Sequence, residues 1–376
     1  MSAAATYALL WAGFLAYLGA VAKAPRLGRR LVWGAILLAL VVFAAVPPLL
    51  SQDVYSYVDY ARLGVVHDLN PYVFPPAAAP SDPAFAEVGW PDATSAYGPL
   101  FTLTTYPLAW LSVDTAVWLL KTVVAASVLG LAVLVARLAP ARGVDPLRAA
   151  AFVALNPLVL AHVVGGGHND AMAALLAMLG VAAVLSGREA FGGVAFVASC
   201  ATKAPAALAA PFALLAQRPT GRKVRSEVTL RPVGSGSFLF GAVVASLAIG
   251  LAAHAAFGWH WLDSLGLVGQ NQGRVSNYSV PNLLSELLNL DIDLVRTAAV
   301  VAFLALFGAL LVGVWRGADW IRASAWATLG LLLATAWLLP WYLIWALPLT
   351  ALSRDAKLQL LVLALTALQL AARVPL

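Results

Sequence analysis

The stretch that decides the fold is residues 31–62, which read LVWGAILLALVVFAAVPPLLSQDVYSYVDYAR. Its first twenty residues carry no charge, and a transmembrane helix needs roughly 20 mostly apolar residues. The next twelve residues bring two acids, three tyrosines and an arginine together. This pattern predicts a helix that crosses a membrane, followed at once by a polar segment at the membrane surface.

The composition of the whole chain supports the same interpretation. Of 376 residues, 62% are hydrophobic and only 11% are charged, whereas a soluble globular chain carries about 25% charged residues. So few charges could not cover a soluble surface. We therefore predict an all-α, polytopic transmembrane bundle that forms a single integral membrane domain over 1–376, with no separate soluble domain and no role in nucleic-acid binding.

About twelve helices are expected from the apolar runs. Residues 4–22 are interpreted as a true span because no charged segment precedes them and no small-residue cleavage site follows. The run 190–217 is divided at Lys203-Ala204-Pro205, since proline disfavours helix at the residue before it. The segment 99–111 is expected in or near the interface. The runs are 4–22, 31–50, 115–138, 147–164, 168–187, 190–202, 204–217, 235–257, 294–315, 321–339, 341–353 and 356–373.

Charge asymmetry predicts the orientation of this bundle. With the N-terminus outside, 17 of the 23 Lys and Arg residues fall in inside loops, among them the basic loop 218–231. Such an excess is the positive-inside signature of a cytoplasmic membrane protein. Five basic residues fall outside (Arg62, Lys203, Arg274, Arg296 and Arg373), and Lys121 lies within a span. The two long loops, 51–98 and 258–293, then lie on the extracytoplasmic face, where we expect short interfacial helices and the functional site.

The first of these loops holds the strongest catalytic candidate. Read as a helix, it places Asp53, Tyr57 and Tyr60 on one face, and Tyr55, Asp59 and Arg62 on another. An interfacial helix with aromatic anchors would explain the tyrosines equally well. Asp53 is different, because an acid at the membrane boundary is costly unless it is paired or used. Such a carboxylate is suited to act as a general base.

A second cluster follows three glycines, at Gly165-Gly166-Gly167-His168-Asn169-Asp170. Its polar residues open a helix, and one of them could be a plain N-cap. A cap does not explain all three, and helix N-termini also bind phosphate. No further His or Cys ligand set accompanies them. The sequence therefore assigns no cofactor, and it leaves open whether a divalent metal assists.

Three separated cations on the outer face suit an anionic ligand such as a lipid phosphate: Arg62, Lys203 and Arg274. Scattered lipid-headgroup contacts are the alternative, weakest for Lys203 because it stands alone at the tip of a helical hairpin. Tyr97 and Trp341 are candidates for contacts with a sugar. Membrane-interface aromatic belts explain most residues of their kind, and Gly98-Pro99 beside Tyr97 is interpreted as a turn.

The order of these motifs resembles a known family. The series runs from Asp53-Val54-Tyr55-Ser56-Tyr57 and Arg62 through Asn70-Pro71-Tyr72, Tyr97-Gly98-Pro99, Asn156-Pro157, Gly166-Gly167-His168-Asn169-Asp170 and Lys203-Ala204-Pro205 to Pro340-Trp341-Tyr342-Leu343-Ile344-Trp345. It resembles the polyprenyl-phosphomannose-dependent α-1,6-mannosyltransferases of the MptA/MptB group, within the GT-C superfamily. The resemblance covers about residues 45–350.

This resemblance implies a GT-C-like bundle in which Asp53 is the catalytic base. It also implies an inverting transfer of a sugar, with mannose favoured, from a polyprenyl-phosphate donor to a glycan or glycolipid acceptor on the outer face of the cell membrane. Arg62, Lys203, Arg274 and His168 would then hold the donor phosphate. The sugar or acceptor would contact Tyr57, Tyr97, Asn169, Asp170 and Trp341.

Two other functions remain open from the residues alone. A lipid-linked glycan polymerase or ligase would need similar outer cations. A transporter or flippase of lipid-linked sugars is disfavoured, because transporters place ionisable residues near the bilayer midplane in repeated halves. This chain has Lys121 as its clear mid-span charge and shows no repeat. The sequence does not identify the donor sugar, the acceptor, the linkage or the oligomeric state.

Overall fold

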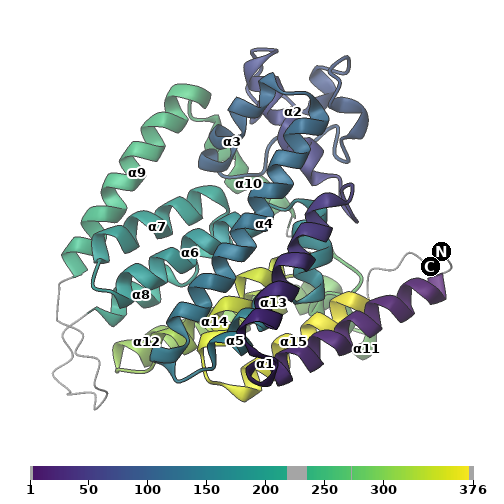
Figure 1. The fold of residues 1–376 in the computed structure, drawn as a ribbon. Coiled ribbons are helices and arrows are strands. Elements are labelled where there is room, and N and C mark those ends of the chain that lie inside the picture. The colour runs from purple at the N-terminus through teal and green to yellow at the C-terminus, as the bar shows by residue number, and fades with distance from the viewer. Residues whose placement is uncertain (1–2, 218–234, 272, 372–376) are drawn as a thin grey trace.

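The computed structural model describes residues 3–217, 235–271 and 273–371, and within them every regular element is helical (Figure 1). The fold is therefore all-α, as the composition predicted. The basic loop 218–231 and Arg373 lie outside the described residues.

Four of the described helices are long and apolar enough to cross a membrane: α1 (Ala3–Ala45), α4 (Val113–Leu138), α9 (Ser235–Phe257) and α12 (Ile292–Trp315). Large apolar side chains on them face outward, such as Leu251, 68% exposed, and Leu304, 59% exposed. Outward-facing leucines are costly in water and favourable in hydrocarbon. These exposed faces are therefore consistent with contact to lipid.

The other apolar segments form shorter helices, and several are interrupted where proline occurs. The run 147–164 divides at Asn156-Pro157, and the run 341–353 begins as the 3₁₀ turn Pro340–Trp345. Proline removes a backbone donor and clashes with the preceding turn. The shorter helices are α5 (Pro146–Ala154), a π-helix (Val159–Val164), α6 (Asp170–Leu185), α7 (Glu189–Thr202), α8 (Ala210–Ala216) after the 3₁₀ turn Ala204–Ala207, α13 (Trp320–Ala334), α14 (Leu347–Leu352) and α15 (Ala356–Ala371).

The first two predicted runs are the two arms of α1. They meet at Gly28, whose φ of 78° is a left-handed conformation that glycine adopts without steric cost. Figure 1 shows α1 changing direction at this bend. The second arm ends just before Pro47-Pro48 and delivers the chain to the polar loop.

Short helices occupy both long loops, as the sequence predicted. The first loop holds α2 (Asp53–Val65) and the 3₁₀ turns Pro76–Ala78 and Phe85–Glu87, and it leads into α3 (Pro99–Thr105) and the 3₁₀ turn Tyr106–Trp110. The second loop holds the 3₁₀ turn His260–Leu262, α10 (Asp263–Asn271) and α11 (Val280–Leu288). We call the end of the molecule where α2, α3 and α10 lie, at the top of Figure 1, the loop end.

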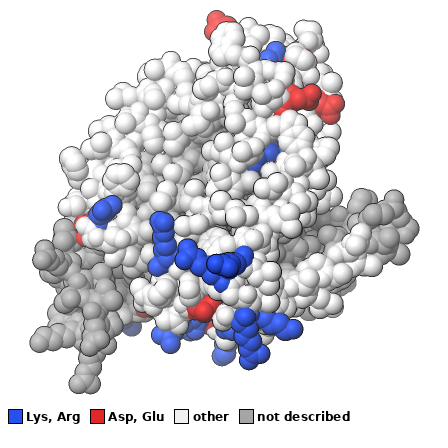
Figure 2. All heavy atoms as spheres, in the orientation of Figure 1, with Lys and Arg blue, Asp and Glu red and all other residues white. Residues whose placement is uncertain are grey.

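A separate apolar cluster fixes α2 at the loop end. Val54, Tyr57 and Val58 of α2 pack against Phe101 of α3 and Val117 of α4. Figure 2 shows Lys and Arg side chains gathered at the opposite, lower end of the molecule. The fold thus separates a polar loop end from a basic end, with the apolar helices between them.

Candidate active site

Asp53 is placed at the loop end by the chain that leaves α1. The backbone N–H of Leu49 donates to the Gly165 carbonyl at 3.0 Å, which joins this exit segment to the glycine cluster. A Cβ on Gly166 would lie 3.1 Å from the Leu49 carbonyl oxygen, and Gly167 has φ of 73°. The glycines therefore allow the His168 segment to approach the start of α2 closely.

Three side chains surround the Asp53 carboxylate. The Trp90 indole N–H donates to Oδ1 at 3.3 Å, the Tyr97 hydroxyl donates to Oδ2 at 3.5 Å, and His168 Nδ1 lies 3.6 Å from Oδ2. Burial raises the pKa of Asp53, and the nearby Lys203 charge and these hydrogen bonds partly oppose that increase. The Asp53 side chain is still 14% exposed, so a carboxylate with enhanced proton affinity remains in contact with solvent.

His168 is fully buried and lies flat against Trp341. The two ring centroids are 3.7 Å apart with an interplanar angle of 16°. A second buried histidine, His162, approaches the same indole at 6.2 Å from the π-helix Val159–Val164. A π-helical turn of this kind is rare and is frequently found at functional sites. The predicted residues His168 and Trp341 are therefore brought together beside Asp53.

Lys203 lies at the break between α7 and the following 3₁₀ turn, as the proline there predicted. Its Nζ donates to Asp170 Oδ2 at 2.6 Å and lies 3.5 Å from Asn169 Oδ1. The Tyr97 and Tyr342 rings also face the ammonium, with centroids at 6.0 and 5.2 Å. Four of the predicted site residues, Lys203, Asn169, Asp170 and Tyr97, thus form one cluster.

Tyr57 and Tyr97 form the aromatic wall of the site. Their rings meet edge to face at 4.8 Å, and each ring also contacts Phe101. Burial raises the pKa of both hydroxyls well above the usual tyrosine value, with the negative charge of Asp53 adding to the increase. Both phenols are therefore neutral near pH 7 and available as hydrogen-bond donors.

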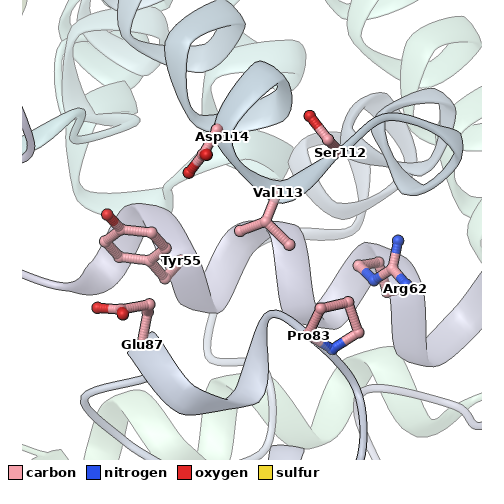
Figure 3. Close-up of a pocket in the computed structure, with 7 residues that line it drawn as sticks. All are labelled: Tyr55, Arg62, Pro83, Glu87, Ser112, Val113 and Asp114. Carbon is pink, nitrogen blue, oxygen red and sulfur yellow. The ribbon is translucent and has the colours of Figure 1, made fainter.

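Arg62 lies on a different face of α2 from Asp53. Its guanidinium donates to Asp82 at 2.8 Å and to the Ala109 carbonyl at 2.9 Å, and Asp82 also contacts His67. On this face, Tyr55 and Arg62 line an open pocket of about 450 Å³ together with Pro83, Glu87, Ser112, Val113 and Asp114. Figure 3 shows these seven residues. Asp53, His168 and Lys203 do not line this pocket, so we locate the candidate active site on the Asp53 face.

Arg274 contacts two tryptophans that the sequence analysis did not identify, and one of them, Trp90, contacts Asp53. Its guanidinium lies over Trp90 at 5.0 Å and over Trp337 at 5.2 Å from the ring centroids. Trp90 follows Gly89 in a loop, and Trp337 precedes Pro340. Both resemble ordinary interfacial tryptophans in sequence. Only the structure shows that they contact each other and Arg274.

Within residues 3–217, 235–271 and 273–371, no three His, Cys, Asp or Glu side chains gather in a manner that could hold a metal ion. The charged groups around Asp53 are organised as one carboxylate beside a histidine and a lysine–aspartate pair. Such an arrangement suits proton transfer together with stabilisation of an anion.

The helices that are long and apolar enough to cross a membrane, together with this cluster of titratable side chains, define a membrane protein with a candidate catalytic site. Residues 1–218 match the family model described as α-(1→6)-mannopyranosyltransferase, N-terminal domain. The chain belongs to this MptA/MptB family of mannosyltransferases, as the order of its motifs indicated.

Two curated relatives show the extent of the similarity. The chain is 29% identical to α-(1→6)-mannopyranosyltransferase A of Mycobacterium tuberculosis, over 93% of this chain and 71% of the relative. It is 26% identical to α-(1→6)-mannopyranosyltransferase A of Corynebacterium glutamicum, over 73% of this chain and 60% of the relative. The matched part is thus clearly shorter than either relative. No solved structure matches the chain.

Proposed function

We propose that the protein is an inverting glycosyltransferase that moves mannose from a polyprenyl-phosphate donor to a glycan or glycolipid acceptor at the extracytoplasmic face of the cell membrane. The observation that carries the proposal is the convergence of Asp53, His168 and Lys203 at the loop end. These residues come from α2, from the turn before α6 and from the break after α7. Family membership supports mannosyl transfer.

Asp53 would act as the general base. In a single displacement, the acceptor hydroxyl oxygen attacks the anomeric carbon as the bond from that carbon to the phosphate oxygen breaks. The hydroxyl proton passes to Asp53, whose raised pKa brings its proton affinity closer to the working pH. Attack from the side opposite the phosphate inverts the anomeric configuration.

Lys203, which is 16% exposed, would receive the charge that develops on the leaving phosphate, whereas His168 is fully buried and contacts Asp53 instead. A phosphate monoester leaves without a strong acid if cations stabilise it. Lys203 directs one N–H to Asp170 and one, at 3.5 Å, to Asn169, and its third N–H is available for a phosphate oxygen. The Asp170 carboxylate and the facing rings hold the ammonium in place before the donor arrives. We leave Arg62 out of this phosphate site because its guanidinium is held by Asp82.

Orientation follows from the distribution of charge. Basic side chains gather at the end opposite the loop end in Figure 2, and cytoplasmic loops carry the excess of Lys and Arg. The loop end, with Asp53, would therefore face away from the cytoplasm. A lipid-linked donor suits this placement, because Asp53 follows closely on the apolar second arm of α1.

The test is mannosyl transfer by the purified protein in detergent, from synthetic polyprenyl-phosphate-mannose to a short α-mannoside. Wild type, Asp53→Asn and Asp92→Asn are compared, and a parallel wild-type reaction contains EDTA. Asp92 is an exposed acid of the same loop and is the matched control.

We expect transfer by wild type and Asp92→Asn, and a loss of at least 10³-fold in Asp53→Asn at unchanged thermal stability, in the range of a lost general base. Equal rates in all three proteins would remove Asp53 from the mechanism while leaving the enzyme class. Failure of wild type with every polyprenyl-phosphate sugar supplied would overturn the proposal. Loss in EDTA would add a metal to it.

A further inference from the structure

Trp90 is an exposed aromatic side chain that touches the proposed base directly. Its indole N–H donates to Asp53 Oδ1, yet 43% of the residue is exposed. The preceding Gly89 explains this position, because a Cβ there would lie 3.1 Å from Gln52 Oε1 and 3.3 Å from Gln52 Cβ. The close approach of Gly89 to the residue before Asp53 brings the indole to the carboxylate.

The second long loop fixes this tryptophan from the other side. Arg274 lies over both Trp90 and Trp337, and the two indoles meet edge to face at 6.4 Å. Ser276 holds this loop in register. Its N–H donates to the Ala336 carbonyl at 2.9 Å, and its hydroxyl donates to the Leu338 carbonyl at 2.9 Å. Ser276 therefore binds the chain on both sides of Trp337 and sets Arg274 above the ring.

The chemistry of this cluster matches a sugar ring. A pyranose has an apolar C–H face that packs on an indole and a rim of hydroxyls that accept from a guanidinium or donate to a carboxylate. An acceptor hydroxyl must come within hydrogen-bond reach of the base, and Trp90 already lies at that distance from Asp53. A sugar placed against Trp90 would therefore present a hydroxyl to Oδ1 with little rearrangement.

We propose that Trp90, Arg274 and Trp337 form the acceptor-sugar subsite, and that the Trp90 indole N–H orients Asp53 toward the acceptor hydroxyl. This inference rests on the proposed function for its reaction. Arg274 is thereby moved from the donor phosphate, where the sequence analysis had placed it, to the acceptor. Trp90 has two roles, since its ring binds the sugar and its N–H positions the base.

Two measurements test the subsite. The first is binding of a short α-mannoside to the protein in detergent without donor, which saturation-transfer NMR detects. The second is the KM for acceptor and for donor in the transfer reaction. The variants are Trp90→Ala, Trp90→Phe, Arg274→Ala and the control Trp110→Ala, a tryptophan 76% exposed elsewhere.

We expect Trp90→Ala and Arg274→Ala to raise the acceptor KM at least tenfold and to weaken mannoside binding, while the donor KM changes less than twofold. Trp90→Phe keeps a ring but loses the N–H. It should largely retain mannoside binding and shift the acid limb of the pH–rate profile to higher pH, because the lost hydrogen bond had lowered the pKa of Asp53.

The outcomes separate this inference from the proposed function. Unchanged mannoside binding and acceptor KM in Trp90→Ala would overturn the subsite, even if wild type transfers mannose normally. Mannoside binding that is lost in Trp90→Ala would support the subsite even if wild type failed to use polyprenyl-phosphate-mannose. Equal losses in Trp110→Ala would show a general effect of tryptophan removal and would overturn the assignment.

Discussion

The ammonium of Lys203 lies 2.6 Å from Asp170 Oδ2, and the Asp170 side chain is fully buried while Lys203 remains 16% exposed. The pair joins the start of α6 to the break after α7. Its buried member has a structural role, and its partly exposed member can still meet a substrate. Stability and activity should therefore respond differently when the two residues are changed singly and together.

Lys203→Met should lower both the thermal midpoint and the transfer rate, because it leaves the buried Asp170 carboxylate without its counter-charge. Breaking a buried ion pair from one side typically costs about 3–5 kcal/mol. Adding Asp170→Asn should restore most of the thermal midpoint, since the pair is then neutral, but not the rate. Thermal unfolding in detergent and transfer assays on the single and double variants make the comparison. Recovery of activity in the double variant would contradict a role for the Lys203 charge in the reaction.

The pH dependence of the rate should reflect the raised pKa of Asp53. A base must be ionised, so the rate should fall as pH decreases through that pKa, at a pH above the ordinary carboxyl range. Tyr97→Phe keeps the ring contacts with Tyr57 and Phe101 but removes the hydroxyl that donates to Oδ2. The acid limb should therefore move to higher pH in this variant. A profile that is identical to wild type would show that the 3.5 Å contact does not influence the base.

Much of this architecture follows from composition and periodicity. Apolar runs predicted α4, α9 and α12, because a span must be long and mostly apolar, whereas α1 joins two of the predicted runs. The helical face shared by Asp53 and Tyr57 was predicted from the 3.6-residue repeat alone. The proline after Lys203 predicted the break that places this lysine at the site. Each of these is a local property of the chain, so a single sequence contains it.

The remaining features depend on contacts between distant segments. Arg62 carries the same charge as Lys203, yet Asp82 holds it on another face of α2, and only the course of the loop decides that pairing. Trp90 is part of the site because it donates to Asp53, and Trp337 is part of it because Arg274 lies over its ring. Gly98 was interpreted as part of a turn, and it does end the loop before α3, but in the structure its backbone also lies against the end of α7. No local pattern distinguishes these cases.

Gly98→Ala tests that contact. A Cβ at Gly98 would lie 2.1 Å from the Ala201 carbonyl oxygen, and the Gly98 N–H donates to the Thr202 carbonyl at 3.3 Å. The backbone at Gly98 and the backbone at Ala201 would have to move apart, next to Lys203 and Tyr97. We expect a lower thermal midpoint and a transfer rate reduced at least tenfold. Gly250→Ala in α9 is the control, since a Cβ there meets no atom within 4 Å. A wild-type rate in Gly98→Ala would show that this approach is not needed for the site.

Asp59 should make stability depend on pH. Its side chain is 1% exposed, and its two carboxylate oxygens have no hydrogen-bond partner among the described residues. Burial raises its pKa from 3.8 to about 7, and the charge of Asp82 adds to this while His67 and Arg62 oppose it. The folded protein therefore binds a proton more tightly at Asp59 than the unfolded chain does.

The stabilisation that this proton provides is fully present below the unfolded pKa and is lost as pH rises through about 7. At full ionisation the loss is on the order of 4 kcal/mol. Asp59→Asn resembles the protonated acid and cannot ionise, so it should unfold several degrees above wild type at pH of about 8.5 and by a clearly smaller margin at pH of about 5. Thermal unfolding in detergent at both pH values measures the difference, with Asp92→Asn as the exposed control. An Asp59→Asn effect of equal size at both pH values would mean that Asp59 does not titrate in this range.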